Sequence, residues 1–369
     1  MKLLNLVSST FLLALIIGSC SRVKDVETNP IVQKIDSLMD NDPDFSGVIL
    51  VASEGRIRYH KAFGFKDYQK ELPLDTTNIF ELASVSKQFT AMVIMLLKEE
   101  GKLNYDDSLS SYLPGLPYKG ITLRHLLTHT SGLPDYQAIM DQHWDKSKIA
   151  SNDDNIDYLI KYHPPSLFPP GEKYDYSNTG YMLLASLAER ASGKDFIELS
   201  RDRIFTPLKM QNTDIRTRDE KRALVNFASG YIYVEDKHRY VVADSFPEFN
   251  YTIWLGNRKG PGRISSTSSD LLKWDRALYS ERLVKRTTLE DAFSPMRLNS
   301  DSLSNYGFGW EIVPTSSNGK IVFHEGDNPG YKTVIVRYID SDKTIIVLSN
   351  NASDSVKSIV SFIQKQLAQ

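Results

Sequence analysis

The chain has 369 residues, of which 41% are hydrophobic and 24% are charged, a composition ordinary for a globular protein. Its 44 Lys and Arg residues against 46 Asp and Glu residues give a net charge of -2 and no basic patch stands out, so nucleic acid is not expected as a partner. A chain of this length can bury a large core, in one domain or in two that share a cleft, without a disulfide or metal.

The N-terminal segment has the pattern of a secretory signal. An apolar run follows Lys2 and is shorter than the ~20 residues of a membrane-spanning helix. Ile17-Gly18-Ser19-Cys20 resembles the bacterial lipobox, and Cys20 is the only cysteine. We therefore expect a signal peptide over residues 1–19 and a lipidated tether over residues 20–29. The protein would then be exported and anchored to a membrane of a bacterial cell envelope, in the periplasm or at the cell surface; a cytosolic protein with a buried N-terminal helix is the alternative.

Hydrophobic periodicity predicts strands near both ends of the chain and helices between them. A helix over 30–40 precedes a hairpin of residues 46–53 and 56–63. The helix predicted over 86–100 has apolar residues at helical spacing and ends at Gly101. Residues 102–264 are expected to be helix and loop, with helices over 123–127, 156–161 and 180–191. The remaining elements are a helix over 270–279, strands over 308–313, 321–323, 333–338 and 344–348, and a final helix over 355–367.

These elements predict a mixed α/β fold. The simplest assembly is one antiparallel sheet built from both ends of the chain, flanked by helices, with an all-helical domain inserted. The α/β part would comprise residues 30–83 and 265–369, and the helical part residues 84–264. A cleft between the two parts is the expected position of a site.

Ser84-Val85-Ser86-Lys87 stands at the start of the predicted apolar helix. The spacing places the lysine one turn after the serine on the same face, where its amine can take the hydroxyl proton or lower its pKa. The helix N-terminus adds partial positive charge beside the serine. Two other Ser-x-x-Lys matches, Ser21/Lys24 and Ser317/Lys320, fall in the predicted tether and in a hairpin turn. Alone, the motif favours an ordinary N-cap serine with a solvated lysine.

Two further segments carry residues that could act with such a serine. In Tyr176-Ser177-Asn178, a tyrosine near a lysine can ionise and act as a general base, and the asparagine can hold a substrate amide. In His324-Glu325-Gly326, the histidine could face a substrate carboxylate, and the glycine would let a substrate lie along a strand edge. Taken singly, the two segments are better explained by a loop tyrosine bonded to backbone and a surface histidine.

Together and in this order, the three motifs match the signature of penicillin-recognising serine enzymes, Ser-x-x-Lys, Tyr-x-Asn and a strand with Lys/His-x-Gly. Over roughly residues 30–365 the chain resembles the β-lactamase-like serine hydrolase family, in the branch with class C β-lactamases, DD-peptidases and related esterases. Further segments that resemble this branch are Phe80–Lys87, Ile121–Leu133, Pro170–Gly171, Tyr176–Tyr181 and Tyr306–Trp310.

The resemblance implies a β-lactamase/transpeptidase-like fold and an acyl-enzyme mechanism that needs no cofactor or metal. Ser84 would attack a carbonyl group, and Lys87 and Tyr176 would share its proton. Tyr176 would be the base toward the leaving group, although which of the two is the general base stays open.

The resemblance also implies the residues that bind substrate. Asn178 would position either the substrate amide or Lys87, and His324 and Gly326 would contact the substrate. The backbone N–H groups of Ser84 and Asp327 would form the oxyanion hole.

The chain departs from the family pattern at one position, because His324-Glu325-Gly326 replaces Lys-Thr-Gly. Efficient class C β-lactamases carry lysine there, whereas DD-peptidases and esterase-like members more often carry histidine or other residues. The departure favours a hydrolase of small amides or esters, of esterase or D-amino-acid peptidase type, acting on a small-molecule or peptide substrate. A class C-like β-lactamase and a non-turnover penicillin-binding sensor remain alternatives, and the sequence does not fix the oligomeric state.

No metal site is expected. His125 and His129 have the spacing of zinc ligands on a helix, but no Glu follows His125 and Ser131-Gly132 ends the helix. Both histidines are interpreted as structural support for the floor of the active site. Ser151–Asn155 is rich in oxygen ligands but lacks the later glycine and glutamate of a calcium loop.

Overall fold

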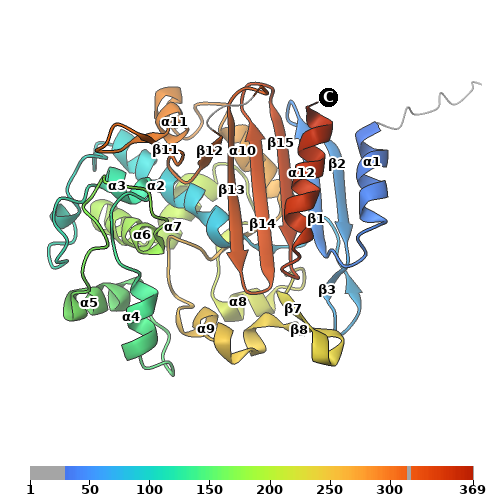
Figure 1. Cartoon of the computed structure of the whole chain (residues 1–369), viewed down its shortest axis with the longest axis horizontal. Coiled ribbons are helices and arrows are strands. Elements are labelled where there is room, and N and C mark those ends of the chain that lie inside the picture. The colour runs from blue at the N-terminus through green and yellow to red at the C-terminus, as the bar shows by residue number, and fades with distance from the viewer. Residues whose placement is uncertain (1–29, 314–316, 369) are drawn as a thin grey trace, which may run out of the picture.

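The computed structural model describes residues 30–313 and 317–368 (Figure 1). The predicted signal peptide, Cys20 and the tether of residues 20–29 lie outside the described residues, so the lipid anchor stays a prediction. Within the described ranges, no helix has both the length and the apolar character needed to cross a membrane.

A six-stranded antiparallel sheet joins the two ends of the chain, as predicted. The hydrogen-bonded order is β12-β13-β14-β15-β1-β2, so the N-terminal hairpin extends the C-terminal strands. Strands β1 and β15 pair from Gly47 opposite Ser349 to Ser53 opposite Lys343, and side chains on both of their faces are buried. The six strands are β1 (Gly47–Ser53), β2 (Arg56–Phe63), β12 (Glu311–Val313), β13 (Ile321–Asn328), β14 (Tyr331–Tyr338) and β15 (Lys343–Ser349).

Helices cover both faces of this sheet (Figure 1). Alternation along β1 sends Ile49 toward α1 (Pro30–Met39) and α12 (Ser355–Leu367), and Leu50 toward α2 (Lys87–Glu99) and α10 (Ser268–Ala277). A fully buried ion pair also fastens α10 to the sheet, with Arg337 Nε 2.6 Å from Asp275 Oδ1.

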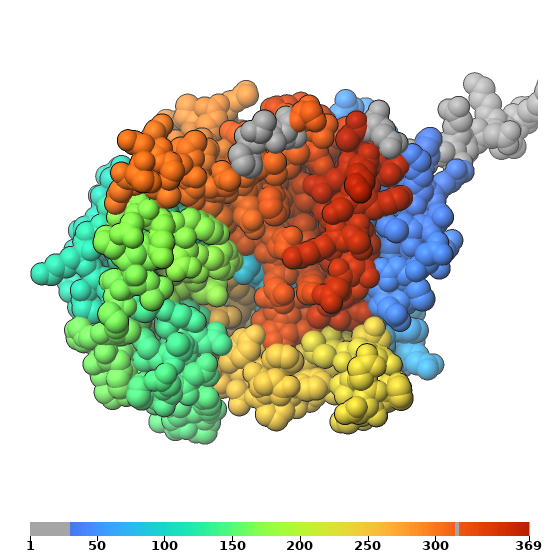
Figure 2. Space-filling model, in the orientation of Figure 1, coloured from blue at the N-terminus to red at the C-terminus, as the bar shows by residue number. Residues whose placement is uncertain are grey.

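Residues 123–205 form the side of the molecule away from α1, and residues 218–254 lie beneath the sheet (Figures 1 and 2). Helix α2 packs against α6 (Asn178–Ser192), and the 3-10 turn of Ala83–Ser86 that leads into α2 contacts β13. The start of α2 therefore lies where the helical segment meets the sheet. The other helices are α3 (Leu123–Leu127), α4 (Tyr136–His143), α5 (Asn152–Tyr162), α7 (Phe196–Ser200), α8 (Arg218–Ala223), α9 (Tyr251–Trp254) and α11 (Arg286–Ala292).

Three features differ from the sequence prediction. Residues 308–310 are not in a strand, because Gly309 has φ +77° where the chain passes close to the backbone of α2. Strand β13 continues past Phe323 to Asn328, which places the His-x-Gly motif inside the strand. The middle of the chain also contains short strands that the prediction of helix and loop did not include. Including these, the short strands are β3 (Phe65–Asp67), β4 (Leu72–Pro73), β5 (Phe80–Glu81), β6 (Asp214–Ile215), β7 (Tyr231–Val234), β8 (Arg239–Val242), β9 (Ile264–Ser266), β10 (Met296–Arg297) and β11 (Leu303–Ser304).

Candidate active site

Ser84 is held in a tight turn between β5 and α2. Strand β5 pairs with β9, and Leu82 N–H donates to the carbonyl of Ile264 at 2.8 Å. The Leu82 carbonyl accepts from the Thr333 hydroxyl of β14 at 2.8 Å. Ala83 adopts φ +47°, a backbone conformation that is strained for a residue other than glycine and recurs at functional sites. These constraints fix the serine at the start of the helix, next to the sheet.

Lys87 is fully buried, one turn after Ser84. Its Nζ lies 3.0 Å from Ser84 Oγ, 2.9 Å from Asn178 Oδ1 and 2.9 Å from the Pro261 carbonyl oxygen. The carbonyl is kept in place because the adjacent Gly260 carbonyl accepts from Thr90 of α2 at 2.7 Å. The amine therefore has three defined neighbours, drawn from segments far apart in the sequence.

The charge of this amine is disfavoured. Burial lowers the pKa of Lys87 well below its usual value, and the Arg258 guanidinium lowers it further. The Asn178 and Pro261 oxygens can only accept hydrogen bonds, so in the neutral amine they hold the two remaining protons. The lone pair is then directed at the hydroxyl of Ser84, which can donate its proton along that line.

Tyr176 lies close to both Ser84 and Lys87. Its hydroxyl is hydrogen-bonded to Ser84, and Lys87 Nζ lies 4.7 Å from the centre of its ring. Desolvation raises the pKa of Tyr176, and the bond to Ser84 offsets only part of this rise. The phenol is therefore protonated near neutral pH, a state suited to donating a proton. This direction differs from the ionised tyrosine expected from the sequence.

Asn178 is the first residue of α6, and Ser177 caps that helix by accepting from Gly180 N–H at 3.1 Å. Its side-chain oxygen is the group that holds Lys87, one of the two roles expected for it. Asn178 also lines the small cavity beside Ser84.

His324 lies near this cluster but is turned into the protein. The side chain is 1% exposed, Nε2 is 2.8 Å from the Tyr306 hydroxyl, and Nδ1 is 2.6 Å from the Glu325 carbonyl oxygen. Because a carbonyl only accepts, Nδ1 carries the proton and Nε2 accepts from Tyr306. Burial and the nearby Lys87 lower the pKa of His324 to about 3, so the ring is neutral. The ring has no N–H left for a substrate carboxylate, in contrast to the sequence expectation.

Close packing requires a glycine at position 326, a requirement that the sequence did not show. A Cβ at this position would lie 2.3 Å from both the Leu82 carbonyl oxygen and the Thr333 hydroxyl, so the glycine lets β13 approach the turn before Ser84. The edge of the strand thereby reaches the cavity beside Ser84. That cavity, of about 110 Å³, is lined by both residues expected to supply the oxyanion hole, Ser84 and Asp327.

Three residues that contribute to the active site were not identified from the sequence. The Pro261 carbonyl holds Lys87, Arg258 lowers its pKa, and Arg263 lines the Ser84 cavity together with Arg258. The one signal in the sequence is the basic, glycine-containing run of residues 258–263, which has no periodicity to show that it folds onto α2.

His125 in α3 and His129, just after this helix, play different structural roles. His125 Nδ1 accepts from Thr122 N–H at 3.1 Å and so caps α3. His129 is buried beneath Tyr176, with ring centres 4.3 Å apart, and its Nδ1 accepts from Ser177 N–H at 3.0 Å. His129 therefore supports the segment that carries Tyr176, in line with a structural role. Among the described residues, no group of three or more His, Cys, Asp or Glu side chains could hold a metal ion.

Comparison with known proteins identifies the family. The family model described as Beta-lactamase matches residues 33–366. Penicillin-binding protein 4* of Bacillus subtilis (strain 168) is 43% identical over 312 residues, which cover 84% of this chain and 69% of the relative. A solved penicillin-binding protein from Bacillus halodurans is 27% identical with a TM-score of 0.77, covering 90% of this chain and 98% of that one. The D-amino acid amidase from Ochrobactrum anthropi SV3 shares the fold at 23% identity, with a TM-score of 0.72 over 92% of this chain and 99% of that one. The chain belongs to the beta-lactamase family of serine hydrolases.

Proposed function

We propose that the protein hydrolyses small amide or ester substrates through an acyl-enzyme on Ser84, as an esterase or a D-amino-acid peptidase. The observation that carries this proposal is the environment of Lys87. Two oxygens that can only accept, from Asn178 and Pro261, leave the Ser84 hydroxyl as the one neighbour that can donate to the amine. A neutral, buried amine in this position is a general base for a serine nucleophile.

The acylation step follows from this arrangement. Ser84 Oγ attacks the substrate carbonyl carbon, and the hydroxyl proton passes to Lys87. The backbone N–H groups of Ser84 and Asp327 would stabilise the negative charge on the carbonyl oxygen, and one such donor is typically worth about 2.7–4 kcal/mol. As the leaving group departs it takes a proton from the Tyr176 hydroxyl, which regains one from Lys87. We therefore assign Tyr176 as the acid, because its raised pKa keeps it protonated.

Deacylation repeats the same proton transfers. Water attacks the ester carbon of the acyl-Ser84 and Lys87 accepts a proton of the water. Lys87 then returns this proton to Ser84 Oγ, which leaves as the hydroxyl. The product acid is released and the enzyme returns to its starting state. Slow water attack would instead leave a stable acyl-enzyme, which is the behaviour of a penicillin-binding sensor.

The proposed substrate class rests on the names of two similar proteins and on the environment of His324. One relative is named a penicillin-binding protein and the amidase, which shares the fold, is named for D-amino acids. Penicillin is itself a cyclic amide. A serine that penicillin acylates can therefore react with an amide carbonyl group. The buried His324 lacks a charge for the carboxylate of such a compound, which favours esters and amides without that carboxylate over efficient β-lactam turnover.

A substrate panel tests this function. The purified protein should turn over nitrophenyl esters or D-alanyl-D-alanine peptides faster than nitrocefin, and Ser84→Ala should abolish every activity. Ser317→Ala is the matched control, because it removes the serine of another Ser-x-x-Lys match that lies in a turn of the C-terminal hairpin. Fast nitrocefin turnover would favour the β-lactamase, and one acylation without turnover would favour the sensor.

We also propose export and lipid anchoring through Cys20, on the strength of the lipobox-like Ile17–Cys20 segment. Membrane fractionation of cells that express the full chain tests this. Wild-type protein should be in the membrane fraction and Cys20→Ala should leave it or keep an uncleaved signal, whereas wild-type protein entirely in the soluble fraction would contradict the proposal.

A further inference from the structure

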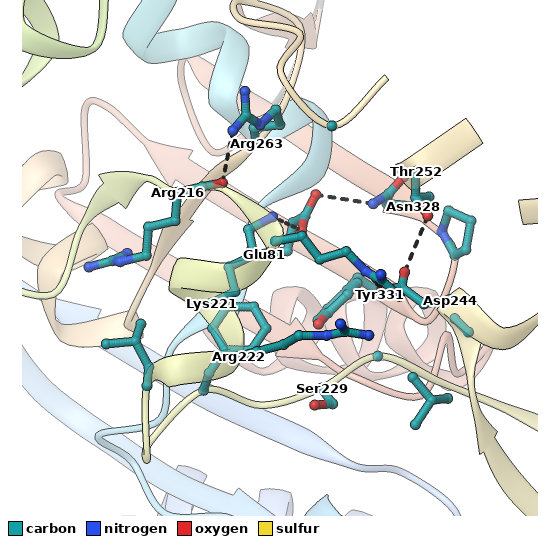
Figure 3. Close-up of a pocket in the computed structure, with 18 of the residues that line it drawn as sticks. Glu81, Arg216, Lys221, Arg222, Ser229, Asp244, Thr252, Arg263, Asn328 and Tyr331 are labelled. Atoms are coloured by element: carbon teal, nitrogen blue, oxygen red, sulfur yellow. Dashed lines mark hydrogen bonds and ion pairs between the residues drawn. The ribbon is translucent and has the colours of Figure 1, made fainter. Parts of the chain in front are cut away.

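A second, larger cavity adjoins the cavity beside Ser84. Residues of β3, β4, α8 and α9 line this cavity of about 460 Å³, and α8 and α9 lie beneath the lower end of the sheet (Figure 1). Figure 3 shows the side chains that line it. The two cavities share four lining residues, which are Glu81, Arg258, Arg263 and Asn328. A substrate attached to Ser84 could therefore extend from one cavity into the other.

The larger cavity is strongly cationic. Eight lysine and arginine side chains line it against three carboxylates, although the whole chain has a net charge of -2. Each carboxylate already has a partner, since Asp67 pairs with Lys70 at 3.1 Å, Asp244 with Arg218 at 2.7 Å, and Glu81 with Lys221. Among the described residues, no carboxylate lies within ion-pair distance of the other five cations, which are Lys66, Arg216, Arg222, Arg258 and Arg263.

Arg263 stands out among these five. It is 6% exposed and has φ +77°. Its guanidinium donates to the carbonyl oxygen of Arg216 at 3.0 Å (Figure 3) and to that of Arg258 at 3.4 Å. Burial lowers its pKa to about 10, so the guanidinium is still charged near neutral pH. A buried charge without a counter-ion and a strained backbone both cost stability, and such features persist where function requires them.

Two more arginines complete the cationic wall. Arg258 donates to the Tyr136 hydroxyl at 2.7 Å, and its Nε is buried with no hydrogen-bond partner among the described residues. Arg222 is exposed and reaches across the cavity below Glu81 and Lys221 (Figure 3). Arg216 is different, because its guanidinium is held by Ser265 Oγ at 2.7 Å and extends away from the others.

We propose that this cavity binds an anionic group, a carboxylate or a phosphate, on the part of the substrate that extends beyond Ser84. Arg222, Arg258 and Arg263 would be its donors, since arginine pairs with both groups through parallel N–H···O bonds. This inference rests on the proposed hydrolase function and specifies its substrate class. The anionic group lies away from His324, so the site differs from the carboxylate position expected on β13.

Matched esters test the proposal. The series comprises 4-nitrophenyl butyrate, the mono-4-nitrophenyl esters of succinate, glutarate and adipate, and nitrophenyl esters with a terminal phosphate on the same acyl chains. Wild-type kcat/KM should favour at least one anionic ester over the neutral one, and Arg222→Gln should reduce that preference about 5–10-fold, a loss on the scale of one charge-assisted contact. The kcat/KM for butyrate should stay unchanged, and the chain length and end group that respond identify the ligand chemistry.

The control is Arg239→Gln, which removes an equal charge from an exposed position on β8 that does not line the cavity. It should leave the preference unchanged, while added salt should weaken the preference in wild type. If anionic and neutral esters are hydrolysed alike, or if both arginine variants behave alike, the proposal is overturned while the hydrolase function stands.

A binding measurement covers the case in which no ester is hydrolysed. Glutarate and pyrophosphate are titrated calorimetrically into wild type, Arg222→Gln, Arg263→Gln and Arg239→Gln. At least one of the two anions should bind wild type and Arg239→Gln equally, and several-fold more weakly to the two cavity variants. Absence of binding, or equal binding to all four proteins, would reject the anion site whatever the reaction on Ser84.

Discussion

Gly326 on β13 lies directly against the carbonyl oxygen of Leu82, close enough that a Cβ would be 2.3 Å from it. The contact holds the turn before Ser84 against the edge of the sheet. Gly326→Ala should therefore destabilise the fold by about 1–3 kcal/mol, the usual cost of overpacking, and reduce ester turnover more than stability alone explains. Denaturant unfolding and kcat measure the two effects.

The control for that variant is Gly262→Ala, where the nearest atom to a Cβ would be 3.8 Å away. Its stability should stay close to wild type. If Gly326→Ala is as stable and as active as wild type, the turn before Ser84 does not depend on this contact.

The buried amine of Lys87 should make stability depend on pH in a defined direction. Its pKa is lowered in the folded state, so between that value and its ordinary value near 10.5 the unfolded chain binds more protons. The free energy of unfolding of wild type, minus that of Lys87→Met, should therefore rise with pH across this window. Unfolding in denaturant at several pH values measures this difference. A difference that stays flat or falls with pH would show that the pKa of Lys87 is not lowered in the folded protein.

Arg258 should set part of the pH dependence of catalysis. It lowers the pKa of Lys87, so Arg258→Gln should raise that pKa. If neutral Lys87 is the base, the acidic limb of kcat/KM for a neutral ester should move to higher pH. Arg239→Gln, which changes an exposed arginine on β8, should leave the limb in place. A limb that stays or moves to lower pH in Arg258→Gln would argue against Lys87 as the base.

The variant His324→Lys distinguishes two roles for position 324, a substrate-binding residue or a buried structural one. The sequence pattern predicts that lysine would bind substrate carboxylates and raise activity on β-lactams. The structure instead predicts a buried cation that acts electrostatically on Lys87, with a loss of the order of 3 kcal/mol in stability and no gain on a cephalosporin. Denaturant unfolding and kcat/KM for one ester and one cephalosporin distinguish these outcomes. Higher cephalosporin activity at unchanged stability would restore the sequence interpretation.

Local patterns in the sequence predicted much of this fold. The apolar spacing of α2 and the apolar run of β1 are signals carried by neighbouring residues, and the structure confirms these elements. The spacing of Ser84 and Lys87 likewise needs only one helical turn. Strand β13 was predicted too short because Glu325, Gly326 and Asp327 lack the apolar character of a strand, yet they pair fully with β14.

The features of the site that the sequence did not predict depend on contacts between segments far apart in the chain. The Pro261 carbonyl reaches Lys87 across 174 residues, and a carbonyl leaves no trace in a sequence pattern. The orientation of His324 depends on Tyr306, and the clustering of Arg222, Arg258 and Arg263 depends on how α8 and the loop after α9 fold beneath the sheet. These features decide the acid and base roles and the charge of the second cavity, which is why residue types alone did not predict them.

Locating the covalent intermediate shows directly whether Ser84 is the nucleophile. Wild-type protein is mixed with a slowly released penicillin or with a nitrophenyl ester, quenched in acid during turnover, and analysed by intact mass and peptide mapping. One acyl group should be found for each protein molecule, on the peptide that contains Ser84, with no adduct in Ser84→Ala and a normal adduct in Ser317→Ala. Turnover that continues in Ser84→Ala, or an adduct that maps to any other residue, would contradict this assignment.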